Sequence, residues 1–240
     1  MDPADLDVAI DREGRALLAA AKAGLDAPVP ACPGWVVADV VGHMGRVHRS
    51  VAGILERGTR DAPNDEIPAP PPGDAVLAFY EEGLDRLLSA LASTPPDTPV
   101  YTWADPPVAG FYHRRMAHEL AIHRFDVESA HGTPSPFDAE QATDAISELY
   151  EVVLPFAVRR AKHALPAGSM HLHRTDGPGE WLVKLVDGEL VATHEHAKGD
   201  VAVRAPASDL LVFVWNRGRP SSLEVFGDAE VAAAWSGLAP

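Results

Sequence analysis

The sequence of 240 residues is poor in cysteine, in positive charge and in long apolar runs. Its single cysteine, Cys32, excludes an internal disulfide. Lysine and arginine number 20 against 35 aspartates and glutamates, so the formal net charge is -15. Nucleic acids and anionic membranes repel a chain of this charge. Apolar runs such as LLVFVW are far too short to cross a bilayer. We therefore expect no nucleic-acid partner and no membrane association.

Signals for secretion and for common cofactors are missing as well. The first residues, MDPADLDVAIDREG, have neither the basic nor the apolar region of a signal peptide. Together with the single cysteine, this favours a cytoplasmic protein. The sequence contains no G-x-G-x-x-G, no Walker loop and no G-x-S-x-G motif. Candidate chemistry must therefore be sought in other residues.

The first half of the chain has the apolar periodicity of amphipathic helices. Four are predicted, at about residues 5–25, 36–58, 74–93 and 111–131, and proline-rich segments separate them. A fifth helix is predicted from Asp138 to His163, with a kink or an interruption near Pro155. Four amphipathic helices on such loops indicate a four-helix bundle.

After Pro166 the apolar period changes from that of a helix to that of a strand. SMHLHR, EWLVKLV, GELVATHE and GDVAVRA alternate, and Asp187-Gly188 is a tight-turn signal between two of them. A short helix, the strand SSLEVFG and a closing helix follow. The fold class is therefore α+β, with a mostly antiparallel sheet in the second part. We predict a bundle at residues 1–135, a bridging helix at 136–165 and a small α+β domain at 166–240.

Three side chains from two predicted helices form the main candidate site. Glu119 and His123 are four residues apart, so they lie on one helical face, one turn apart. His43 lies in a separate helix, on the apolar stripe of Val36, Val40, His43, Val47, Val51 and Ile54. Two imidazoles and a carboxylate turned toward a helical core are what a zinc-type catalytic site needs, with a fourth position for water or substrate.

Structural explanations compete with this metal site. A lone histidine on an apolar stripe is more often a core residue with satisfied nitrogens. Glu119 could pair with Arg115, one turn earlier, instead of with a cation. The metalloprotease motif H-E-x-x-H is excluded, because the sequence here is H-E-x-x-x-H. Over five residues a helix rotates His118 about 140° away from His123. Asp126 could hold the second ring nitrogen of His123, or be an exposed helix charge.

Other polar residues are weaker candidates. His171 and His173 share one face of a predicted strand, as do His194 and His196. They could form a second site, although a solvated face explains them equally simply. Cys32 near a helix start could have a lowered pKa or be a small buried residue. Three arginines near the C-terminus could bind an anionic group or lie on an ordinary surface: Arg204, Arg217 and Arg219.

Three segments resemble the mycothiol-dependent maleylpyruvate isomerase family. They are VPACPGWVVADVVGHMGRVHRS, RRMAHELAIHRFDVESAHG and GDVAVRAPASDLLVFVWNRG. The resemblance implies a DinB-like metal-binding bundle, with zinc held by His43, Glu119 and His123, followed by a sterol-carrier-like domain. It also implies a catalytic arginine in that second domain. Arg217 matches its position, and Arg219 is two residues away.

Residues and resemblance together predict a zinc-dependent, mycothiol-using enzyme. Its thiolate would add to a small electrophile, as an isomerase or an S-transferase. The expected partners are a small-molecule thiol and a carboxylate-bearing electrophilic substrate, and the chain would be a monomer or a homodimer. A hydrolase that uses metal without thiol and a non-catalytic metal- or ligand-binding module stay open. Two histidines and a glutamate also suit nickel, iron or cobalt.

Overall fold

The computed structural model describes residues 1–64, 66–161 and 165–239. The chain divides into two compact units, Met1–Ser135 and Pro136–Pro240. The segment 136–165, for which we predict a bridging helix, groups with the second unit. Among the described residues, no helix combines the length and the apolarity that a bilayer span requires. The predicted α+β class is confirmed, because the first unit is helical and the second contains a sheet.

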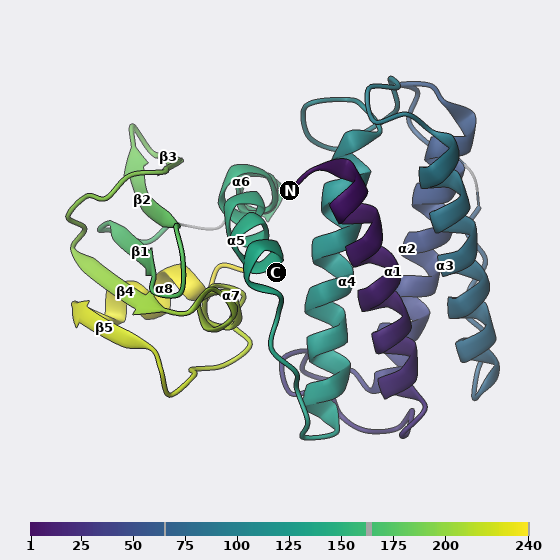
Figure 1. Ribbon diagram of the computed structural model, residues 1–240, viewed down its shortest axis with the longest axis horizontal. Helices are drawn as coiled ribbons and strands as arrows, with labels where there is room; N and C mark the ends of the chain where they lie inside the picture. The colour runs from purple at the N-terminus through teal and green to yellow at the C-terminus, as the bar shows by residue number, and fades with distance from the viewer. Residues whose placement is uncertain (65, 162–164, 240) are drawn as a thin grey trace. The chain divides into compact units, whose positions relative to one another are not determined.

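The first unit is a bundle of four long helices (Figure 1). The helices are α1 (Pro3–Ala21), α2 (Val37–Arg57), α3 (Ala75–Ser93) and α4 (Gly110–Ala130). All four correspond to predicted helices. Helix α1 packs mainly on α4, and α2 packs mainly on α3. Helices α2 and α4 also touch, and this contact brings together residues far apart in the sequence.

Capping residues set the ends of α1 and α2. The side chain of Asp2 accepts the N–H of Asp5 at 2.9 Å, and Pro3 occupies the first helical position, where no donor is needed. The carboxylate of Asp39 accepts the N–H of Val36 at 2.9 Å. Gly58 ends α2 in the left-handed conformation, with φ of 60°. These caps fix where α2 begins, and therefore where His43 lies.

The second unit begins with an interrupted helix. It comprises α5 (Ala139–Glu148), a π-helical turn (Leu149–Val153) and α6 (Leu154–Ala161). The N–H of Leu154 donates to the carbonyl of Leu149, five residues back, immediately before Pro155. Since a proline ring clashes with the carbonyl four residues earlier, a wider turn at this point relieves the clash. The interruption near Pro155 is confirmed, and the predicted end at His163 lies outside the described residues.

A five-stranded sheet follows, in the order β3-β2-β1-β4-β5. Its strands are β1 (Met170–Arg174), β2 (Glu180–Val186), β3 (Glu189–Thr193), β4 (Val201–Ala205) and β5 (Glu224–Gly227). The β1–β4 pair is parallel and the other three pairs are antiparallel. Asp187 and Gly188 join β2 to β3 with φ of 53° and 85°, as the predicted tight turn requires. The sheet is therefore mostly antiparallel, as predicted.

Two short helices contribute to the core of the second unit. Helix α7 (Ala207–Val214) and helix α8 (Ala229–Ser236) both contact β1 and β4, and α7 also packs on α5. Trp181 of β2 and Trp235 of α8 are each 1% exposed. Met170 and Leu172 of β1 are buried as well. Because side chains alternate along a strand, this burial leaves His171 and His173 on the other face of β1.

Candidate metal centre

His43, Glu119 and His123 lie together where α2 contacts α4. The Nε2 atom of His43 is 3.5 Å from the Oε1 atom of Glu119. The ring centroids of His43 and His123 are 5.2 Å apart, with an angle of 72° between their planes. One possible ligand atom from each of the three side chains lies within 4.8 Å of the other two. Two distant stretches of sequence thus converge on a space that could hold one cation.

The predicted stripe on α2 is buried in part. Val40, Val51 and Ile54 are buried, whereas Val36 and Val47 are partly exposed. The side chain of His43 is 37% exposed, so it lies at the margin of the buried face. His43 is thus less buried than its place on the stripe indicates. A marginal position leaves the imidazole accessible to solvent and small molecules.

Glu119 is held from two sides. Its Oε1 atom faces His43, and its Oε2 atom accepts the Nε–H of Arg115 at 3.2 Å. Burial disfavours the ionised carboxylate. The hydrogen bond from His43 and the charges of Arg115 and His123 outweigh burial and lower the pKa of Glu119 to about 2. The alternative ion pair with Arg115 is thus formed, but it engages one carboxylate oxygen and leaves the other toward the histidines.

Asp126 orients His123. Its Oδ2 atom lies 3.1 Å from Nδ1 of His123, and Asp126 is fully buried. A carboxylate at this nitrogen favours the tautomer with the proton on Nδ1, which leaves a lone pair on Nε2. The orienting role predicted for Asp126 therefore fits this geometry, and an exposed helix charge does not. The half-buried Cys32 lies nearby, with its Sγ atom 3.9 Å from the same Oδ2 atom.

The two neighbouring histidines do not join this group. His48 is fully buried and stacks edge-on against Tyr80, with ring centroids 5.0 Å apart. Burial lowers the pKa of His48 to about 3, so the ring is neutral near pH 7. His118 is also fully buried and is absent from the group of converging ligand atoms. The spacing of five residues that excludes His118 as a partner of His123 agrees with this arrangement, and the same spacing separates His48 from His43.

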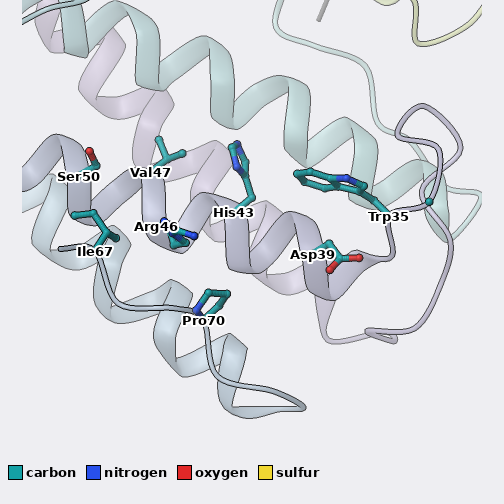
Figure 2. Close-up of a pocket in the computed structure, with 9 residues that line it drawn as sticks. Trp35, Asp39, His43, Arg46, Val47, Ser50, Ile67 and Pro70 are labelled. Atoms are coloured by element: carbon teal, nitrogen blue, oxygen red, sulfur yellow. The ribbon is translucent and has the colours of Figure 1, made fainter.

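A pocket of about 640 Å³ opens beside His43. Figure 2 shows Trp35 and His43 projecting to the same side of α2, with Arg46 one turn along the helix. The ring centroids of Trp35 and His43 are 5.6 Å apart. The pocket is lined by Gly34, Trp35, Asp39, His43, Arg46, Val47, Ser50, Ile67 and Pro70. Sequence reasoning missed Arg46, although its place three residues after His43 puts it on a neighbouring part of the helix surface.

The arginine expected from the resemblance belongs to the second unit. Arg217 follows α7 and is half-buried, and its Nη1 atom donates to the carbonyl of Trp215 at 2.8 Å. Its guanidinium carbon lies 5.7 Å from the ring centroid of Trp215. Arg219 is exposed. A catalytic role for Arg217, or for Arg219 in its place, stays a prediction.

Comparisons with known proteins agree on one family. The family model described as the mycothiol maleylpyruvate isomerase N-terminal domain matches residues 8–128, and the corresponding C-terminal domain matches residues 140–234. No curated protein sequence matches the chain. A crystal structure of the mycothiol-dependent maleylpyruvate isomerase is similar at a TM-score of 0.59 and 11% identity, covering 94% of this chain and 93% of that one.

Two further solved structures match the chain. A single-site mutant of the same isomerase gives a TM-score of 0.61 at 10% identity, over the same shares of both chains. The UbiJ-SCP2 ubiquinone synthesis protein matches 43% of this chain and 92% of its own, at 22% identity and a TM-score of 0.28. The isomerase structures support the fold, and the two family models span both units. The chain belongs to the mycothiol-dependent maleylpyruvate isomerase family.

Proposed function

We propose that this protein is a zinc-dependent enzyme that uses mycothiol to attack a small electrophilic substrate. The thiol would add to an electrophilic carbon. The adduct would then either rotate about the former double bond and eliminate the thiol, which gives the isomerised substrate, or be released as a thioether. The observation that carries the proposal is the convergence of His43, Glu119 and His123 in a chain of this family.

The donor set suits a zinc-type ion. Two imidazole nitrogens and one carboxylate oxygen are the ligands of many catalytic zinc sites that keep a position open. Glu119 is ionised at neutral pH, since its pKa is about 2. His123 has Nδ1 engaged with Asp126, so Nε2 is the nitrogen that could bind an ion. A zinc ion held by these three side chains would act as a Lewis acid and lower the pKa of a thiol that reaches it.

The surrounding residues keep the ligands in place. Arg115 is 5% exposed at its side chain and binds the second oxygen of Glu119, so the carboxylate presents Oε1 toward His43. Asp126 lies against Nδ1 of His123 and favours the tautomer with the proton on that nitrogen. A ligand could approach from the side of His43, because His43 is the most exposed member of the triad, at 37%.

The pocket beside His43 offers recognition of an anionic, partly apolar molecule. Arg46 supplies a permanent positive charge, and Ile67, Pro70 and Trp35 supply apolar surface. A carboxylate-bearing electrophile is therefore a suitable substrate class for this pocket. We assign Arg46 to the carboxylate on this ground, and Arg217 is retained as a second candidate that the resemblance implies.

Metal content and substrate conversion test the proposal together. Purified protein is loaded with Zn²⁺, dialysed and analysed for metal. Conversion to an isomer or to a thioether is then followed with mycothiol and a panel of unsaturated acids and their methyl esters. We expect His123→Ala to lose one bound zinc and all turnover. Arg46→Ala should keep the zinc and lose rate with the acids while retaining it with the esters.

Several results would contradict these assignments. If both His123→Ala and His43→Ala leave the zinc content unchanged, these residues do not bind the metal. Equal turnover without added thiol would favour the hydrolase. Metal binding without conversion of any electrophile would favour the non-catalytic binding module. An equal loss of rate on acids and esters in Arg46→Ala would refute the carboxylate assignment.

A further inference from the structure

A second histidine cluster lies on the sheet of the second unit, around the carboxylate of Glu180. Nε2 of His171 is 2.6 Å from Oε2 of Glu180. Nδ1 of His173 and Nδ1 of His196 lie 2.5 Å and 3.1 Å from Oε1. The rings of His171 and His196 are nearly perpendicular, with centroids 5.1 Å apart. Three imidazoles thus converge on one carboxylate.

Strand register builds this cluster. In the antiparallel β1–β2 pair, His173 lies opposite Glu180, and His171 lies opposite Leu182. Since residues two apart on a strand share a face, His171 and His173 both face the side chain of Glu180. His196 lies three residues beyond the end of β3, and Thr193 of β3 pairs with Leu182. The segment after β3 therefore brings the third imidazole to the same face.

The geometry meets the requirements of a metal site as well as the triad does. One possible ligand atom each from His171, Glu180 and His196 lies within 4.8 Å of the other two, the same span as in the helical triad. Exposure is graded: the side chain of His171 is 7% exposed, that of Glu180 25% and that of His196 78%. An ion could therefore enter from solvent past His196 and reach ligands held by the sheet.

A solvated face explains the cluster less well. Side chains on such a face need no common partner, because water satisfies each of them. Here three imidazoles share the two oxygens of one carboxylate. In the metal-free protein these hydrogen bonds hold the donor atoms near the positions that an ion would use. Binding would release the protons from the ligating nitrogens, as metal binding to histidine commonly does.

We propose that His171, Glu180 and His196 form a second divalent transition-metal site, in which His173 steadies the carboxylate through its hydrogen bond. Two imidazoles and one carboxylate favour Zn²⁺, Ni²⁺ or Cu²⁺ over Mg²⁺ and Ca²⁺, which prefer oxygen ligands. The site shares no residue with the triad, and all of its residues belong to the second unit. Its ion would tie the segment after β3 to β1 and β2, so it would stabilise this unit.

Zinc binding to a His123→Ala chain tests this proposal separately from the proposed function. Equilibrium dialysis against Zn²⁺ should find one equivalent bound to this chain, and His196→Ala in the same background should weaken it more than about tenfold. Removal of a residue that only orients a ligand already lowers metal affinity at least about tenfold, so the loss of a ligand should lower it further. His194→Ala is the matched control. His194 is exposed, lies two residues from His196, and contacts Glu151 instead of Glu180.

Histidine side-chain NMR supplies the local readout. With Zn²⁺ present, the ring signals of His171 and His196 should shift and that of His194 should not. Since His196 is highly exposed, its substitution should leave the fold intact, and amide spectra check this. The proposal is overturned if the His123→Ala chain binds no zinc at micromolar concentrations, or if His196→Ala and His194→Ala bind it equally. Both results can be interpreted even if the triad binds no metal, because the test is made in the His123→Ala chain.

Discussion

Replacing Asp126 with asparagine tests whether the triad is built to hold a cation. Oδ2 of Asp126 lies 3.1 Å from Nδ1 of His123, in a fully buried position. Asparagine keeps the size and can keep an acceptor oxygen at this point, but it removes the negative charge. Asp126→Asn therefore changes the electrostatics of His123 with little change in packing.

The size of the effect follows from the charge that His123 would carry. Two full unit charges at 3.1 Å interact by about 5 kcal/mol at an effective dielectric constant of 20. This is an upper limit, because an imidazole bound to an ion carries a fraction of a charge. Removal of a carboxylate that orients a ligating histidine typically lowers metal affinity 10–100-fold, which is about 1.4–2.7 kcal/mol. We expect a loss of zinc affinity in that range.

Competition with a chromophoric chelator measures the affinity, in a His196→Ala background that removes the second proposed site. Glu66→Gln is the control, because it removes one negative charge from an exposed residue beside Ile67, which lines the pocket next to His43. Screening of exposed charges should leave its affinity close to that of the parent. Equal affinities for Asp126→Asn and Glu66→Gln, with native circular dichroism for both, would refute the orienting role.

Two further predictions concern stability. His48 has a pKa of about 3 in the folded chain and about 6.5 when unfolded, so acidification through that interval destabilises the fold. His48→Phe should remove up to about 1.4 kcal/mol of this loss per pH unit, measured by urea unfolding at pH 7 and pH 5; identical slopes would contradict the assignment. Arg124→Met removes the contacts at 2.6 Å to Glu13 and Glu128, which keep Arg12 and Ser135 as their other partners. It should cost about 2 kcal/mol in thermal unfolding, and a surface-like loss below about 1 kcal/mol would contradict the buried pairing.

The helical part of the fold was predictable because periodicity and proline agree there. Each predicted helix of the first unit is present, and proline-rich segments separate them. The interruption at Pro155 follows from the missing N–H and the ring clash of proline. What periodicity could not give was the exposure of His43. Steps of three and four from Val36 describe a stripe on which Val40, Val51 and Ile54 are buried. They do not show that His43 lies at the margin of this buried face, with its side chain 37% exposed.

The triad was predictable to the extent that helix geometry alone decides it. Glu119 and His123 must share a face at a spacing of four, and any bundle that brings α2 against α4 can add His43. The environment of these residues was harder to predict from the sequence. That Arg115 engages one oxygen of Glu119 while the other faces His43 depends on side-chain rotamers. Arg46 becomes a pocket residue only when the loop carrying Ile67 and Pro70 covers that side of α2.

The cluster around Glu180 shows why a site on a sheet is harder to read from sequence than one on helices. On a helix, the spacing along one chain fixes which side chains meet. On a sheet, the partner of His173 is set by the register of β1 and β2, and a slip of one residue would turn Glu180 to the other face. The sequence shows two histidine pairs of period two, but it contains no local signal that places Glu180 opposite one pair and folds His196 over it. The metal hypothesis for these residues therefore depends on long-range pairing, and the comparison of His196→Ala with His194→Ala tests that pairing as much as the chemistry.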